Sequence, residues 1–128
     1  MSWKKIIFFA INFLLVLPLV AQDHTFTRQD TLRGSITPER AWWDLTYYHL
    51  DIKVDPEKQA IVGKNTIQYK VLKAGSIMQI DLQEPMKITK VEQYGNALDF
   101  ERDGNVFFVE MIDNQKINAL GEVVVHYE

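Results

Sequence analysis

The chain has 128 residues, with 14 Lys and Arg, 17 Asp and Glu, three His and no Cys, which gives a formal net charge of −3. A mildly acidic chain without a basic run argues against nucleic acid or an anionic membrane surface as the partner. Because Cys is missing, no disulfide braces the fold and its stability must come from a packed core.

The first 21 residues have the three-part form of a secretory leader. Lys4 and Lys5 form a basic region, and an apolar run begins at Ile6. The run ends at Val20 and is shorter than the about 20 residues of a membrane-spanning helix, so a cleaved leader is favoured over an anchor. Cleavage after Ala21 would leave 12 basic and 17 acidic residues, a net charge of −5. We therefore predict a signal peptide at 1–21 and export, to the periplasm or the extracellular space in a bacterium.

Residues 22–41 are polar and contain Gly34 and Pro38. They show neither a helical nor a strand period, so we predict an extended arm. Residues 42–128 are within the usual size of one domain and are predicted to form a single β domain.

A strand signal begins after the arm, where apolar and polar residues alternate through 47–55. One face carries Tyr48, Leu50, Ile52 and Val54, and this face is predicted to be buried. Pro56 follows in a predicted tight turn, and residues 61–71 continue with the same period. The two segments are therefore expected to form a long antiparallel hairpin. Gly63 lies within the second strand and predicts a bulge or a close backbone approach.

Shorter strands follow at 77–82, 86–94, 98–101, 106–111 and 122–127, a spacing typical of a sandwich or barrel. Ile88 and Val91 are three residues apart, which predicts a bulge. Asp103-Gly104 is a strong hairpin signal. We therefore predict an all-β fold of about seven antiparallel strands, either a two-layer sandwich or one twisted saddle-like sheet. No convincing amphipathic helix follows the leader. The chain stops inside the last predicted strand, so we expect a domain that is incomplete at its C-terminus.

The search for chemistry begins with the histidines. His49 lies two residues from Asp51, and His126 two residues from Glu128, so either pair could in principle offer two metal ligands from one strand face. No third ligand can be assigned to either pair, and the zinc-protease string H-E-x-x-H is absent. The third histidine, His24, falls in the arm. We therefore predict no catalytic, cofactor-binding or metal-binding residue in this chain.

Four aromatic residues gather where the arm meets the first strand: Trp42, Trp43, Tyr47 and Tyr48. They could form a stacking platform for carbohydrate, as in a binding module. Their position at the entry to the sheet favours a packing corner built from Trp42, Trp43 and Tyr48.

The series of motifs resembles the N-terminal β domain of zinc metallopeptidases of the aminopeptidase N and leukotriene hydrolase type. The first strand matches the family pattern Y-x-L-x-I-x-V-D-P from Tyr48 to Pro56, and a glycine follows in the second strand as Gly63. Residues 77–82 loosely match an I-x-L-D-L strand, and Ile88 with Val91 matches an I-x-x-V strand. The resemblance covers residues 33–128.

The resemblance implies a saddle-like β domain that lies on a thermolysin-like catalytic domain. In that family the catalytic domain holds zinc through H-E-x-x-H and a later Glu, and a G-A-M-E-N-like loop recognises the free amino group of a peptide. Neither string occurs here. We therefore expect a non-catalytic domain or fragment of a secreted metallo-aminopeptidase, inactive alone, with a catalytic domain as its partner. The alternative is a free-standing secreted β-sandwich that binds carbohydrate or protein.

Overall fold

The computed structural model describes residues 25–112 and 115–128. The predicted leader and the first three residues of the predicted arm, His24 among them, lie outside these residues. Within these residues two short helices precede the strands, and the elements are α2 (Arg28–Gly34), α3 (Pro38–Ala41), β1 (Trp43–Asp55), β2 (Ala60–Val71), β3 (Ile77–Asp81), β4 (Ile88–Gln93), β5 (Asn96–Ala97), β6 (Phe100–Asp103), β7 (Val106–Glu110) and β8 (Leu120–Tyr127).

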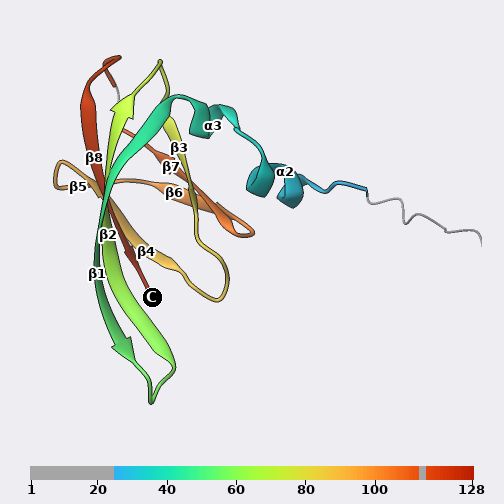
Figure 1. Ribbon diagram of the computed structural model, residues 1–128. Helices are drawn as coiled ribbons and strands as arrows, with labels where there is room; N and C mark the ends of the chain where they lie inside the picture. Colours follow the sequence, from blue (N-terminus) through green and yellow to red (C-terminus); the bar gives the residue numbers. More distant parts are fainter. Residues whose placement is uncertain (1–24, 113–114) are drawn as a thin grey trace, which may run out of the picture.

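The described strands form two antiparallel sheets that face each other (Figure 1). The larger sheet has the order β1-β2-β8-β4-β5, and the smaller sheet has the order β3-β7-β6. This confirms the predicted all-β, two-layer fold. The strand that the sequence did not predict is β5, a two-residue strand paired with the end of β4.

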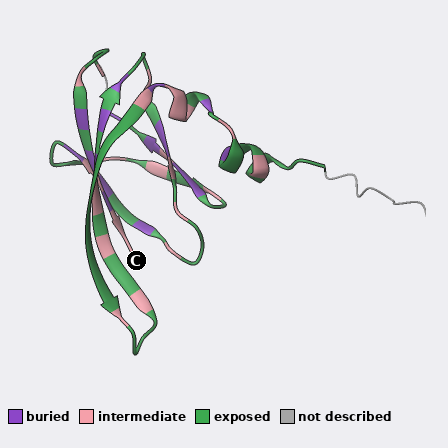
Figure 2. Ribbon diagram, viewed as in Figure 1, coloured by how far each residue is buried: buried purple, intermediate pink, exposed green. Residues whose placement is uncertain are grey.

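The core lies between the sheets and draws on both of them (Figure 2). It forms because the central strands turn alternate apolar residues inward. The larger sheet contributes Ile67, Tyr69, Val71, Val91, Val123 and Val125, and the smaller sheet contributes Met78, Phe107 and Val109.

The predicted β1–β2 hairpin is present, with Ile52 opposite Gly63. Only its half near Trp43 and Val71 lies across from the smaller sheet, and the other half extends beyond that sheet (Figure 1). The prediction that the apolar face of β1 is buried is therefore wrong, since its four apolar residues are about half exposed: Tyr48 48%, Leu50 56%, Ile52 47% and Val54 61%.

The extended arm is also a wrong prediction, because helices α2 and α3 form within it. Thr27 caps α2, and Asp30 completes a capping box by accepting a hydrogen bond from the Thr27 backbone. Pro38 occupies the first turn of α3, where its fixed φ suits a helix. Helices this short cannot show a 3.6-residue period, so capping residues were the only available signal. No helix in the described part of the chain is long and apolar enough to cross a membrane.

The two helices are attached to the smaller sheet by polar contacts. Thr37 Oγ1 donates a hydrogen bond of 2.7 Å to Gln79 Oε1, and Gln79 Nε2 donates one of 3.0 Å to the backbone oxygen of Leu32. Gln79 is almost fully buried. The segment is therefore part of the folded domain.

Three local predictions can be compared with the backbone. A register shift between Ile88 and Lys90 confirms the predicted bulge in β4. Gly104, with φ of 61°, forms the turn between β6 and β7. Pairing is continuous at Gly63, where a Cβ would lie 2.4 Å from the backbone oxygen of Asp51. Gly63 therefore marks a close approach and not a bulge.

Candidate functional site

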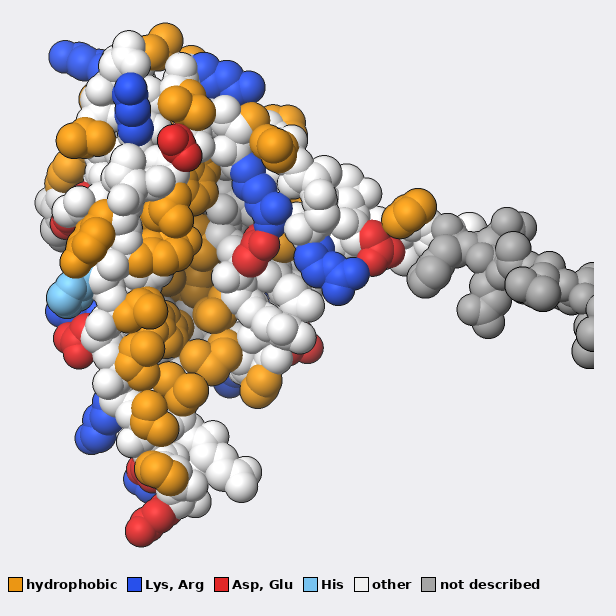
Figure 3. All heavy atoms as spheres, in the orientation of Figure 1, with side chains coloured by type: hydrophobic (Ala, Val, Ile, Leu, Met, Phe, Trp, Pro, Cys, Tyr) orange, Lys and Arg blue, Asp and Glu red, His pale blue; other side chains and the backbone are white. Residues whose placement is uncertain are grey.

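An apolar groove of about 710 Å³ lies on the inner face of the β1–β2 hairpin, between the hairpin and the end of the smaller sheet. Figure 3 shows apolar side chains gathered along this hollow. β1 contributes the largest share of its walls, and the opposite wall comes from β3 and the segment after it, so that the lining includes Leu45, Tyr48, Leu50, Ile52, Ile80, Leu82 and Met86.

A bulge in β1 gives the groove its continuous apolar wall. The register shifts between Leu45 and Tyr47, so the strand has one extra residue there. Without the shift, Leu45 and Tyr48 would point to opposite faces of the sheet, because side chains alternate along a strand. With it, both line the groove. The three-residue spacing of these apolar positions is the same signal that identified the bulge in β4, and the sequence reasoning missed it here.

Few polar groups line the groove. Among the described lining residues the charged side chains are Arg40 and Asp81, which form an ion pair with each other. Burial, and then the negative charge of Asp81, raises the pKa of the Tyr48 hydroxyl above its ordinary value. Asn65 Oδ1 is shielded from solvent and accepts no hydrogen bond from the described residues. The groove is thus an apolar surface and lacks the convergent polar groups of a catalytic site.

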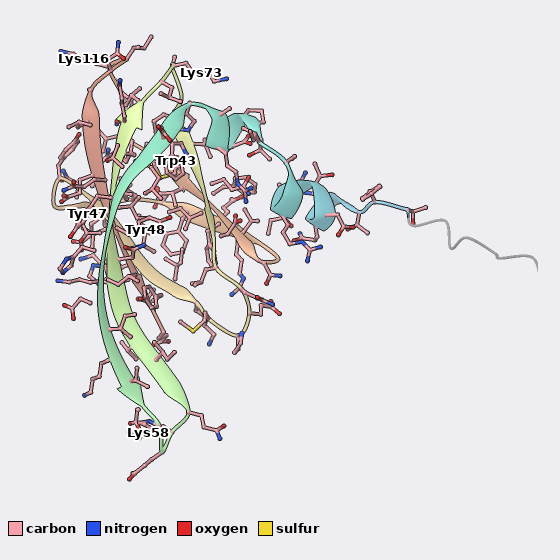
Figure 4. The ribbon with its side chains drawn as sticks, in the orientation of Figure 1. Trp43, Tyr47, Tyr48, Lys58, Lys73 and Lys116 are labelled. Atoms are coloured by element: carbon pink, nitrogen blue, oxygen red, sulfur yellow. The ribbon has the colours of Figure 1, made fainter. Side chains whose placement is uncertain are left out.

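The predicted packing corner divides between two places. Trp42 is 1% exposed, donates a hydrogen bond of 2.6 Å from Nε1 to the Ile77 oxygen, and meets the Tyr69 ring edge-on at 5.7 Å. Trp43 meets the same ring at 6.1 Å and donates from Nε1 to the Glu39 oxygen. Tyr69 is therefore the ring that both tryptophans contact, while Tyr48 lies farther along β1 in the groove wall (Figure 4).

The four entry aromatics do not form one stacking platform. The Trp42 ring is enclosed in the core, so no ligand can reach its face. Tyr47 and Tyr48 project from opposite faces of β1, and the Tyr47 ring lies beside His49 at 6.5 Å. Stacking against a sugar requires exposed rings on a common surface, which this arrangement does not provide.

The histidines lie on the other face of the larger sheet or near its edge. His49 Nδ1 is 3.5 Å from the Tyr47 hydroxyl. His126 Nε2 lies 2.8 Å from Glu92 Oε2, and Lys90 Nζ lies 2.7 Å from Glu92 Oε1. Hydrogen bonds from Lys90 and then His126 lower the pKa of the Glu92 carboxyl. Within residues 25–112 and 115–128, no group of three or more His, Asp or Glu side chains is placed to hold a metal ion.

Comparison with solved structures finds a similar fold in part of LTA4 hydrolase and in part of an M1 zinc metallopeptidase. Native yeast LTA4 hydrolase matches with a TM-score of 0.56 and 21% identity, over 68% of this chain and 14% of that chain. Its complex with bestatin gives the same values. A mutant of a two-domain M1 zinc metallopeptidase, bound to L-arginine, matches with a TM-score of 0.59 and 16% identity, over 69% of this chain and 20% of that chain.

The chain therefore shares the fold of one part of each of these structures, and the alignment spans a fifth or less of their length. No protein-family profile matches the sequence. No curated protein matches it either. The structural likeness agrees with the resemblance given by the sequence motifs, at the level of the fold.

Proposed function

We propose that this chain is the N-terminal β domain of a zinc metallo-aminopeptidase of the aminopeptidase N and leukotriene hydrolase type. The shared fold with yeast LTA4 hydrolase and an M1 zinc metallopeptidase carries the proposal. The ordered motifs support it, since Tyr48 begins the family pattern within β1. Pro56 lies in the turn of the first hairpin, and Gly63 lies at its close backbone approach. The role assigned to the domain is non-catalytic.

Zinc in such a protein would be bound outside the described residues. The described histidines lie on the outer face of the larger sheet, His49 beside Tyr47 and His126 paired with Glu92, and neither belongs to a group of three or more metal-binding side chains among the described residues. The catalytic domain that we propose as a partner would hold the metal, which supplies a Lewis acid and an activated water in such enzymes. This β domain would pack on it and help to shape the access of peptide substrates.

The proposal can be tested on the gene and on the protein. The coding sequence after Glu128 is expected to continue in frame to H-E-x-x-H and a later Glu. An immediate stop, with nothing similar beyond, would instead favour the free-standing binding module. The purified chain alone is expected not to hydrolyse aminoacyl chromogenic substrates, and hydrolysis that a chelator abolishes would contradict the non-catalytic role.

We also propose that the chain is exported through the leader at 1–21. The basic start and the short apolar run support this. Expression in a bacterium with an export pathway, followed by N-terminal sequencing, is expected to find Gln22 as the first residue in the periplasm or the medium. Full-length chain retained in the membrane fraction would contradict cleavage and favour an anchor.

A further inference from the structure

The inner face of the β1–β2 hairpin is an apolar surface that the described residues leave partly uncovered. Six side chains on it are each roughly half exposed: Leu45 43%, Tyr48 48%, Leu50 56%, Ile52 47%, Val54 61% and Ile61 41%. They are contiguous, since five follow one face of β1 and the sixth lies opposite Val54 on β2. Soluble monomers rarely expose a contiguous apolar patch of this kind without a partner.

We infer that this hairpin face binds a second copy of the same chain, so that the chain alone forms a dimer across its groove. The two hairpins would pack face to face, each covering the half of the other that the smaller sheet leaves open. The inference does not depend on the proposed metallopeptidase role, because it rests on the surface of the chain itself.

Charge favours a second copy on this face. The described groove lining carries opposite charges only on Arg40 and Asp81, which already neutralise each other, so two identical faces can approach without like-charge repulsion. The outer face of the same hairpin is different. There Asp51 and Lys64 form an exposed ion pair beside Lys53, and a second sheet packed on them would have to desolvate these charges.

The available area is sufficient for a weak dimer. Six large side chains that are each about half exposed offer on the order of 500 Å² per copy, or about 1,000 Å² for a pair. Specific protein interfaces begin at about this buried area, and the smallest of them are transient. We therefore expect a reversible dimer with a dissociation constant in the micromolar range.

Sedimentation equilibrium of the purified chain over about two orders of magnitude in concentration tests the inference. Monomer and dimer are expected to exchange across this range. Ile52→Asp, on the groove face, is expected to raise the dissociation constant at least about tenfold, because an unpaired carboxylate would enter the interface. Val62→Asp is the matched control: Val62 is 51% exposed on the outer face of the same hairpin, close to the 47% of Ile52.

The control is expected to shift the dissociation constant by less than about twofold, and circular dichroism with thermal melting checks that both variants fold. A chain that is monomeric at every concentration would overturn the inference and leave the face for a different partner. A dimer that Ile52→Asp leaves intact would also overturn it, since association through the free edge of β1 would then be the explanation. The inference would also be overturned if Ile52→Asp and Val62→Asp raised the dissociation constant equally.

Discussion

The side-chain amide of Gln93 donates a hydrogen bond of 2.8 Å to the hydroxyl of Tyr69, and both side chains are fully buried. The Tyr69 hydroxyl in turn donates to Gln115 Oε1 at 3.0 Å. Gln93 Oε1 accepts from the backbone N–H of Ile112 at 3.0 Å. These bonds connect strands β2 and β4 to the segment between β7 and β8, so the buried polar groups of Tyr69 and Gln93 have partners.

Tyr69→Phe is expected to lower the free energy of unfolding by about 1–3 kcal/mol. The substitution keeps the ring under Trp42 but leaves the amide of Gln93 and the oxygen of Gln115 without this partner, and an unpaired buried polar group costs about that much. Urea unfolding measures the change. Tyr94→Phe is the control, because Tyr94 is 66% exposed and is expected to change stability by less than about 0.5 kcal/mol. Equal losses in the two variants would contradict the network.

The same hydroxyl predicts how stability depends on alkaline pH. Burial, followed by the effect of Tyr94, raises the pKa of Tyr69 to about 12, although the bond from Gln93 opposes the shift. The neutral phenol is therefore favoured in the folded state. Its contribution is fully present below the unfolded-state pKa of about 10 and is lost as the pH rises through about 12. The stability difference between wild type and Tyr69→Phe is expected to be constant to about pH 10 and to shrink above it. A difference that grows with pH would reverse the assigned direction of the shift.

The positions of most strands along the chain and the residues of the turns could be predicted from the sequence, because alternation and turn residues are local signals. Whether a second layer of the structure covers a given face of a strand could not be predicted in this way. The alternation of Leu50 and Ile52 shows that they share a side, but whether another layer lies above them depends on how far the smaller sheet extends. The same limit applies to the site. Trp42 and Trp43 are recognisable in the sequence as a cluster, but Tyr69, which contacts both, lies 26 or more residues away. No local sequence pattern indicates that contact.

Thr37→Val is expected to loosen the helical segment more than the sheets. The Thr37 hydroxyl and Gln79 form a buried hydrogen bond, and Gln79 also holds the Leu32 oxygen. Removing the hydroxyl while keeping the volume leaves Gln79 Oε1 without its donor, at a cost of about 1–3 kcal/mol. Amide hydrogen exchange is expected to rise in α2 and α3 while the protection of β2 and β8 falls by less. Thr31→Val is a surface control in α2. Uniform loss of protection across the chain would show that the segment unfolds only with the whole domain.

Gly63→Ala is expected to destabilise the hairpin by about 1–3 kcal/mol. The added Cβ would lie 2.4 Å from the backbone oxygen of Asp51, and a backbone atom cannot move aside as a flexible side chain can. Thermal unfolding measures the loss. Gly34→Ala provides the matched control, since a Cβ at Gly34 meets nothing within 4 Å and alanine is a better helix former by up to about 1 kcal/mol. A neutral Gly63→Ala variant would show that β1 and β2 can separate at this point.

Asn65→Val is expected to stabilise the domain by about 1 kcal/mol. Asn65 lies in the middle of β2 opposite Leu50, with its side chain in the apolar groove and its Oδ1 shielded without a hydrogen bond from the described residues. Valine removes the cost of that acceptor and suits a strand better. Gln68→Val is the control on the exposed face, where Gln68 Nε2 donates to Glu122 and the gain is expected to be smaller. The free energy of unfolding in urea, measured below the concentration at which the chain associates, decides the outcome. A loss of stability in Asn65→Val would mean that the amide has a structural role in the groove that an apolar side chain cannot fill.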